Sequence, residues 1–546
     1  MELNITFWMH LIVAYFLIIG IGRISSKKPP LFYYLIPFFL ITAIPILRIG
    51  IFNPDSFVDS DTLFYHSLVD LVMTPDAFKD DAAMQYFASI YHPVYYFFLS
   101  GFVRLGIPLP IVTKLIGLST GIIIPLLFYY LARLIYSEDK IALVSALCSY
   151  LILPVSQVAA DGLPRSIALV FYLLTLIYSF QYIKNNTFKP FILMTVCMLI
   201  ILYVHVLTFL FLVIPLAVLF GFHLLRCIKF KKKFLSRPAV LLAVLSILII
   251  FYVWFNNYQS YAVSSRSFLK KSNILWVVAA DAQISFLEIL RRVEFYPVIL
   301  FIIYIVFKFF KKTPFYFFEK DISAIVIILL AATFILFKVD NLFYLKPHRY
   351  PLVLAIFFYL MALPLLAQGI IRWSQNKIIL PVIIVFLVIP SAYFINYNLK
   401  RSLFYPEDFP NAIRHEFKLT HELTENNNVI KFKELKAASD YLRTKTTPDT
   451  IIACPIWYGD IIRLYAKRTV TSSWYIGAAS VSHQKPVEIF KQAVKNSQRI
   501  YLNPDRLYTQ SGATYFVLEQ DAFPLFDHKT EEVFSGRYIK VLKILE

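Results

Sequence analysis

The stretch Asp55–His66 (DSFVDSDTLFYH) decides how the rest of the chain is interpreted. It lies in a polar segment, residues 51–91, between hydrophobic segments, and it carries the acidic pair Asp59 and Asp61. Ionised carboxylates are costly near lipid, so a cluster of them in a membrane protein indicates function. The alternative is a solvated loop, because Asp and Ser are ordinary turn residues. Together with the following run Tyr91–Tyr96 (YHPVYY), the acids favour an enzyme that works at the bilayer surface.

The composition is that of a polytopic membrane protein. Of the 546 residues, 59% are hydrophobic, and apolar stretches of about 20 residues recur along most of the chain. The net charge of +19 does not indicate nucleic-acid binding, because the basic residues lie between the apolar stretches and not on one soluble face. The four cysteines form no disulfide framework or metal-type spacing.

The hydrophobic pattern predicts an all-α fold of about 11 to 13 membrane spans. The first span is expected to be retained, because it lacks the small-residue cleavage site of a signal peptide. The predicted spans are residues 5–22, 31–50, 112–135, 139–157, 166–183, 190–204, 206–226, 238–256, 297–310, 322–338, 350–368 and 378–398.

Loop charge predicts the orientation of these spans. One set of loops is rich in Lys and Arg and is expected to be cytoplasmic, whereas the short loops of the alternate set hold only Arg165, Lys346 and Arg349. The N-terminus, the acidic loop and the region after the last span are therefore expected on the extracytoplasmic side. We expect a multi-pass protein of the inner or plasma membrane.

The chain is expected to divide into three parts. Residues 1–400 form the membrane domain, which includes the external loop 51–91 and an interfacial helix at 93–105 that is too short to span. Residues 401–430 form a linker, and residues 431–546 form a small extracytoplasmic α/β domain. In this domain we expect helices at 432–445 and 458–466 and strands at 450–454, 513–518 and 538–544.

Two carboxylates spaced like Asp59 and Asp61 allow two kinds of chemistry. They can share a divalent cation such as Mg²⁺ or Mn²⁺, or one can act as a general base while the other orients it. The helix expected from Thr62 to Val72 places His66 and Asp70 on one surface beyond the pair. Residues that can line a site with the acids are His66, His92, His205 and Tyr65.

Basic residues at the predicted outer ends of spans can bind an anion. Arg165 lies in a short external turn, where a guanidinium suits a phosphate, although an interfacial arginine can equally extend to lipid headgroups. Lys346, His348 and Arg349 lie together before a span, either as an anion site or as interface anchors. In the C-terminal domain, Trp457–Asp460 (WYGD) lies between a strand and a helix, where ligands bind or where a helix simply begins.

The order of these features resembles the GT-C superfamily of membrane glycosyltransferases. This group includes oligosaccharyltransferase catalytic subunits, protein O-mannosyltransferases and aminoarabinose transferases. The resemblance covers about residues 31–400 and rests on an acidic pair in the first external loop, the aromatic-proline segment His92–Gly106, and a span that ends Leu131–Tyr136 (LARLIY). The chain lacks the adjacent Asp-Glu of the mannosyl and aminoarabinose enzymes, and Trp457–Asp460 lacks the order of the oligosaccharyltransferase WWDYG motif.

The resemblance implies an inverting transferase that uses a sugar donor linked to polyprenyl phosphate. It implies that Asp61 is the catalytic acid, with Asp59 second, and that Arg165, Lys346, His348 and Arg349 bind the donor phosphate. A divalent metal at Asp59 and Asp61 is left open. The acceptor is an unidentified glycan, lipid or protein outside the membrane, and membrane lipids are the other partners. The alternative from another class is a lipid or polysaccharide transporter, or a non-catalytic partner of one; scarce glycine and little repeat symmetry weigh against it.

Overall fold

A computed structural model gives the fold of the chain in two compact units. One unit contains residues 1–53, 113–252 and 283–402, and the other contains residues 54–112, 253–282 and 403–546. The structure describes residues 61–74, 93–149, 162–230, 302, 304–306, 308, 318–338, 351–374, 425–455, 458–472, 492, 495–496 and 499–545.

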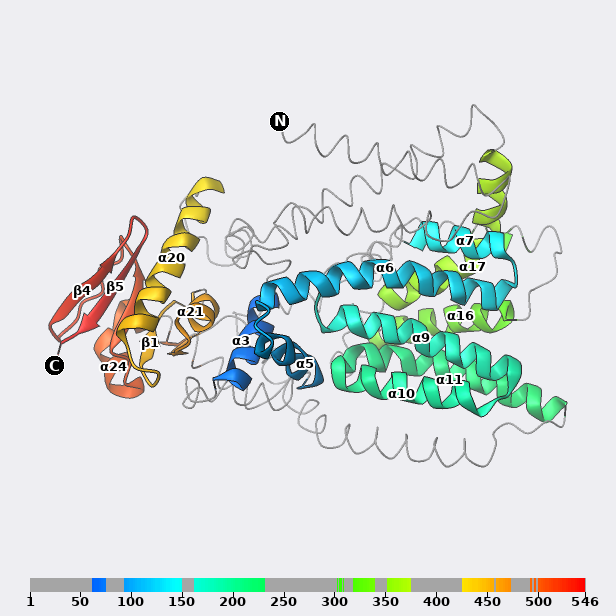
Figure 1. The fold of residues 1–546 in the computed structure, drawn as a ribbon, viewed down its shortest axis with the longest axis horizontal. Coiled ribbons are helices and arrows are strands. Elements are labelled where there is room, and N and C mark those ends of the chain that lie inside the picture. The colour runs from blue at the N-terminus through cyan, green and yellow to red at the C-terminus, as the bar shows by residue number, and fades with distance from the viewer. Residues whose placement is uncertain are drawn as a thin grey trace. The chain divides into compact units, whose positions relative to one another are not determined.

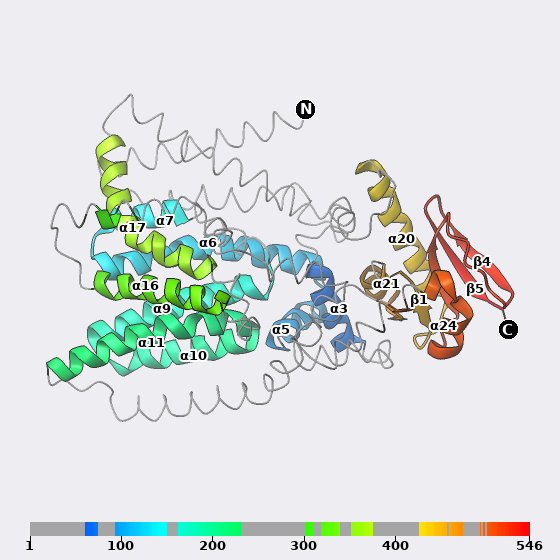
Figure 2. The same ribbon diagram turned by 180° about the vertical axis from the view of Figure 1, so that it is seen from behind.

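The first unit is helical. Its elements are α6 (Leu109–Tyr136, begun in the second unit), α7 (Asp139–Cys148), α9 (Pro164–Asn185), α10 (Phe188–Val204), α11 (Val206–Lys229), α16 (Glu319–Lys338) and α17 (Pro351–Ser374). In the described part of the chain, three helices are long and apolar enough to cross a membrane, at Leu109–Tyr136, Pro164–Asn185 and Phe211–Lys229. Helices α9, α10 and α11 pack side by side (Figures 1 and 2).

The helices follow the hydrophobic pattern of the sequence. Six of the predicted spans coincide with described helices. The spans 112–135, 166–183 and 190–204 correspond to α6, α9 and α10, and the spans 206–226, 322–338 and 350–368 correspond to α11, α16 and α17. The span expected at 139–157 begins as α7 and is described as far as residue 149. The spans expected at 5–22, 31–50, 238–256 and 378–398 lie outside the described residues, as does most of 297–310.

Two ion pairs hold the first turn of α16, and one of them joins it to the end of α11. Arg226, in the last turn of α11, donates two hydrogen bonds to Asp321 at 3.3 and 2.8 Å. Lys308 donates to Glu319 at 3.0 Å, and the carboxylates of Asp321 and Glu319 are buried in the first turn of α16. Acids suit a helix N-terminus and bases suit a C-terminus, so the Arg226–Asp321 pair fixes α16 antiparallel to α11.

The second unit begins with two short helices, α3 (Asp61–Met73) and α5 (Pro93–Arg104), which pack against each other. Leu68 and Val69 of α3 and Leu99 of α5 are fully buried. Val94, Phe97 and Phe98 of α5 are exposed, so this helix presents an uncovered apolar face, as an interfacial helix would.

The rest of the second unit is a mixed α/β domain. Its helices are α20 (Glu425–Lys445), α21 (Gly459–Ala466) and α24 (Pro504–Ser511), and its strands are β1 (Ile451–Ala453), β2 (Thr469–Val470), β3 (Tyr515–Glu519), β4 (Thr530–Ser535) and β5 (Ile539–Ile544). The sheet order is β2-β1-β3-β5-β4. Strand β1 pairs parallel with β2 and β3, whereas β5 pairs antiparallel with β3 and β4. The prediction of a helical protein with a small C-terminal sheet is confirmed.

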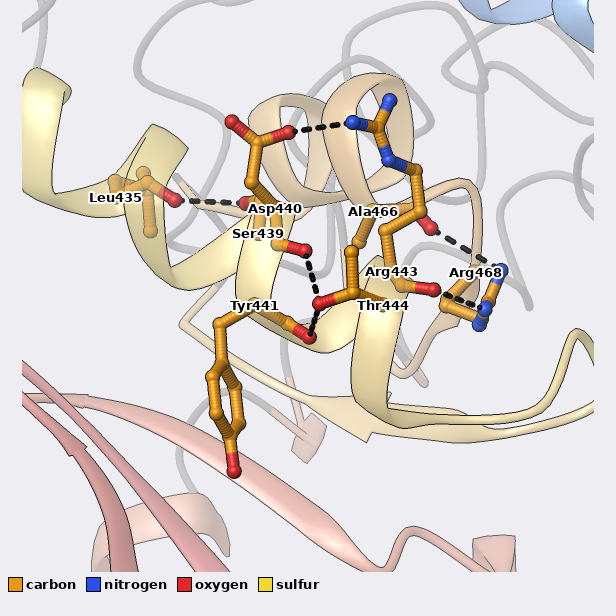
Figure 3. A network of polar contacts seen from close by, with 8 residues as sticks. All are labelled: Leu435, Ser439, Asp440, Tyr441, Arg443, Thr444, Ala466 and Arg468. Atoms are coloured by element: carbon orange, nitrogen blue, oxygen red, sulfur yellow. Dashed lines mark hydrogen bonds and ion pairs between the residues drawn. The ribbon is translucent and has the colours of Figure 1, made fainter.

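Each face of this sheet has its own apolar core. Val517 packs with α20 and α21 on one face, whereas its neighbours Phe516 and Leu518 pack with Leu507 of α24 on the other. This is the period-two alternation of a strand that is covered on both faces. Arg468 holds the end of α20, because it donates to the carbonyls of Arg443 on α20 and Ala466 on α21 (Figure 3). It also donates to the carbonyl of Thr446, the residue after α20.

Three elements of this domain were not expected from the sequence. They are β2, α24 and the edge strand β4, whose sequence TEEVFS carries too little alternation to indicate a strand. The first helix is also longer than expected, because α20 begins at Glu425.

Candidate functional site

Helix α3 begins at Asp61, the residue expected to be the catalytic acid. The side chain of Asp61 and the whole of Asp59 lie outside the described residues. The roles of Asp59 and Asp61 therefore remain predictions, and the structure adds that Asp61 is the first residue of α3.

Two of the residues expected to line the site, Tyr65 and His66, lie on the first turns of α3 and are buried. The ring of Tyr65 meets that of Tyr95 edge to face, with the centroids 5.4 Å apart. This ring contact holds α3 against α5. It therefore joins the acidic segment to the aromatic segment, the two stretches with which the sequence analysis began. His92 lies outside the described residues, next to Pro93, where α5 begins.

Asp70, which follows His66 by one turn of α3, has a partner from the C-terminal domain. Its carboxylate pairs with the ammonium of Lys467. Burial raises the pKa of Asp70 above its ordinary value, and the charge and hydrogen bond of Lys467 oppose that rise. The sequence indicated the place of Asp70 on α3 but gave no sign of this partner.

In the first unit, two of the predicted site residues lie at one end of a helix hairpin. Arg165 is half-buried in the first turn of α9, and His205 is the single residue between α10 and α11. Because α9 and α10 are joined by a short turn at residues 186–187 and pack together, the start of α9 and the end of α10 lie at the same end. His205 Nδ1 accepts a hydrogen bond from the Thr208 backbone N–H at 3.2 Å, which caps α11.

A further basic residue, Lys114, lies at this same end and was not expected from the sequence. Gly162, which precedes α9, lies so close to Thr113 of α6 that a Cβ on it would be 2.0 Å from the Thr113 carbonyl oxygen. Lys114, the next residue of α6, is completely buried. The signal was present in the sequence, because a lysine inside a predicted span marks a functional position unless it is near the membrane interface.

The three remaining phosphate candidates, Lys346, His348 and Arg349, lie outside the described residues. They precede α17, which begins at Pro351. Arg165 and His205 belong to the first unit, whereas Tyr65 and His66 belong to the second, so the structure brings the predicted residues together as two separate groups.

The Trp457–Asp460 segment is accounted for by the packing of its domain. The Tyr458 hydroxyl donates to Glu519 at 2.8 Å, and the buried Asp460 accepts from Arg463 at 3.3 Å. Burial and the nearby Glu519 raise the pKa of Tyr458 well above its ordinary value, so the hydroxyl keeps its proton. The bond from Tyr458 joins the start of α21 to the end of β3, whereas the Asp460–Arg463 bond lies within α21. Trp457 lies outside the described residues.

Among the described residues, no group of three or more His, Cys, Asp and Glu side chains is placed to hold a metal ion. The predicted metal ligands, Asp59 and the Asp61 carboxylate, are not in that set. A metal at the acidic pair stays a prediction.

Several solved structures have a similar fold. The Archaeoglobus fulgidus oligosaccharyltransferase in complex with Zn and sulfate is 11% identical, with a TM-score of 0.50 over 89% of this chain and 68% of that one. The same archaeal enzyme, AglB, in complex with an inhibitory peptide and a dolichol-phosphate is 10% identical, with a TM-score of 0.51 over 89% and 69%. ArnT from Cupriavidus metallidurans bound to undecaprenyl phosphate is 10% identical, with a TM-score of 0.49 over 92% and 97%.

No family model matches the chain, and no match is found among curated proteins. At these identities the likeness to the archaeal enzyme shows the fold alone. It confirms that the chain has a fold similar to that of an oligosaccharyltransferase, one of the enzyme groups that the sequence resembles.

Proposed function

We propose that this protein is a membrane glycosyltransferase that moves a sugar from a polyprenyl-phosphate donor to an acceptor on the extracytoplasmic side. The observation that carries the proposal is the grouping of Lys114, Arg165 and His205 at the predicted outer end of the helices, within a fold shared with an oligosaccharyltransferase. That enzyme has been solved with a dolichol-phosphate, a lipid of the same chemical class as the donor proposed here.

The cationic group suits a lipid phosphate for physical reasons. A guanidinium can hold two phosphate oxygens through parallel N–H···O bonds, and a buried ammonium adds a charge that is only weakly screened. Lys114 is completely buried, and a buried lysine in a predicted span is a candidate for a functional position. Lys346, His348 and Arg349 complete the proposed phosphate site from the segment before α17.

The proposed reaction needs a base and a stabilised leaving group. The Asp61 carboxylate takes the proton from the acceptor nucleophile while the new bond to the anomeric carbon forms. The bond between that carbon and the phosphate oxygen breaks on the opposite face, so the configuration inverts. The electron pair of the broken bond remains on the polyprenyl phosphate, whose added negative charge the cationic group stabilises. Asp59 supports Asp61, and no step depends on a metal.

The test is donor turnover by the purified full chain in lipid vesicles with no ion gradient. The probes are a radiolabelled polyprenyl-phosphate sugar and an extract of the host envelope as acceptor. We expect Asp61→Asn to lower turnover by about 10²- to 10⁴-fold, the usual contribution of a general base. Arg165→Ala should lower it by about 10²- to 10³-fold through loss of leaving-group stabilisation.

Matched controls exist in the first unit. Asp139 and Arg133 form an exposed pair at 3.1 Å, at the junction of α6 and α7, so Asp139→Asn and Arg133→Ala should leave turnover unchanged. Near-wild-type turnover by folded, inserted Asp61→Asn would remove the mechanism. Movement of intact donor lipid that requires a gradient would support a transporter instead. Mass spectrometry of the lipid-linked sugars that accumulate when the gene is deleted would then identify the donor.

A further inference from the structure

The C-terminal domain is in direct contact with the helix that begins at the candidate base. Helix α21 packs against α3, and the Lys467 ammonium at the end of α21 pairs with the Asp70 carboxylate near the end of α3. Both partners belong to the same compact unit. The Asp70 side chain is only 14% exposed and that of Lys467 30%, so solvent screens this pair less than a surface pair.

The backbone of Lys467 is held in an uncommon conformation by several contacts. Lys467 ends α21 in the left-handed region, with φ 55° and ψ 48°, and its N–H donates to the Arg463 carbonyl at 3.1 Å. A side chain in this region costs about 1–2 kcal/mol, and glycine is the usual choice at this position. Lysine is present here, and it is the residue that reaches Asp70. A backbone outlier of this kind points to a role for the side chain.

Arg468 holds the backbone on both sides of Lys467 in place. It is only 6% exposed, and its guanidinium donates to the Lys467 carbonyl at 2.9 Å and to the Ala466 carbonyl at 3.2 Å. It also donates to the carbonyl of Arg443 near the end of α20 (Figure 3) and to that of Thr446, the next residue after α20. The ends of α20 and α21 and the start of β2 are thereby joined at one point. Lys467 extends from that point.

Helix α3 transmits the position of this contact to Asp61. It is a single helix of 13 residues that carries Asp61 at its first position and Asp70 near its last turn. The rise from one to the other is about 13 Å along the helix axis. A tilt of about 5° about the Asp70 end would therefore move the Asp61 end by about 1 Å, a displacement that can lower a rate by about 10²-fold.

We propose that Lys467 is a positioning residue for the transfer reaction, through which the C-terminal domain holds α3 at the angle that presents Asp61 to the acceptor. This inference rests on the proposed function for its consequence in catalysis. The contact between Lys467 and Asp70 is independent of the proposed function. A tether of this kind acts on the transition state and not on donor binding, because Lys114 and Arg165, proposed for the donor phosphate, belong to the first unit.

The experiment compares the full chain with Lys467→Met, which keeps the length of the side chain and removes its charge, and with Lys467→Arg. Hydrogen exchange of peptides that cover residues 61–73 reports the order of α3 without reference to activity. We expect exchange in α3 to become at least about tenfold faster in Lys467→Met, and to stay unchanged in Lys467→Arg. Lys433→Met is the control, because Lys433 is an exposed lysine of α20 in the same domain.

In the turnover assay, Lys467→Met should lower kcat by about 10- to 10²-fold with the donor KM unchanged. Lys467→Arg should restore kcat. The double variant Asp70→Lys with Lys467→Asp, which exchanges the two charges, should recover part of the lost kcat if the two side chains interact directly. Unchanged α3 exchange in Lys467→Met would overturn the positioning role, whatever the activity. If α3 loosens but the wild-type chain shows no transfer, the contact stands and the proposed function fails.

Discussion

Substitution of Gly162 by alanine should disrupt the packing that brings Lys114 and Arg165 to one end of the first unit. Gly162 has φ +64°, and a Cβ at this position would lie 2.0 Å from the carbonyl oxygen of Thr113 and 2.9 Å from its carbonyl carbon. Both obstructing atoms are backbone atoms of α6, which cannot rotate away as a flexible side chain can.

The loss of folding free energy in Gly162→Ala has two parts. The left-handed backbone costs an alanine about 1–2 kcal/mol. The overlap adds more, because a Cβ essentially never lies closer than 3.0 Å to such an atom, and the two segments must separate to relieve it. A separation of about 1 Å forfeits much of the dispersion contact between two packed helices. The sum is on the order of 4 kcal/mol, which is exceptional for one methyl group.

Gly106→Ala provides the matched control. Gly106 also has a positive φ, +81°, but no atom lies within 4 Å of the position that a Cβ would take there, so this variant should show the backbone cost alone. Thermal unfolding of both variants in the same detergent, followed by tryptophan fluorescence, measures the difference. Gly162→Ala should melt well below Gly106→Ala, and its donor turnover should fall. Equal melting temperatures would refute the close approach of α6 and the start of α9.

Two further predictions concern ionisable groups outside the spans. Burial raises the pKa of the Cys454 thiol to about 12. In a variant that keeps only this cysteine, a maleimide at about pH 8 should therefore label the folded chain roughly 10³-fold more slowly than the unfolded chain. Comparable labelling rates would contradict the burial of Cys454. Burial also raises the pKa of Asp70, so its contribution to stability is complete below its ordinary 3.8 and declines as the pH rises through the raised value. Wild type should therefore lose stability relative to Asp70→Asn as the pH rises above about 4, and parallel melting curves would show that the raised pKa is wrong.

The helical part of the fold could be predicted because helices long enough to cross a membrane are marked in the sequence by apolar runs of about 20 residues. The span expected at 166–183 matches α9 to within two residues at each end, and the helix expected from Thr62 to Val72 differs from α3 by one. The short strands are harder. Strand β2 has two residues, Thr469–Val470, and its pairing with β1 depends on the loop that Arg468 holds in place, which no local pattern encodes.

The candidate site could be predicted only where a residue is unusual for its surroundings. Arg165 and His205 are polar residues at the ends of apolar stretches, and both lie at the same end of the α9–α10 hairpin. Lys114 was missed because the start of a predicted span tolerates a lysine that extends to the interface. Its complete burial follows from the packing of α6 in three dimensions, including the contact of Gly162 with Thr113.

The contact between Asp70 and Lys467 changes how the acidic loop is understood. A helix of 13 residues is marginal in water by itself, so the order of α3 must come from its neighbours. One neighbour, α5, follows it closely in sequence, but the other, α21, belongs to the C-terminal domain. The sequence suggested a ligand site at Trp457–Asp460 in that domain, but no part in the order of α3. Because α3 begins at the candidate base, the domain belongs to the scaffold of the site, and a chain truncated before α20 should lose that scaffold while it keeps Asp61.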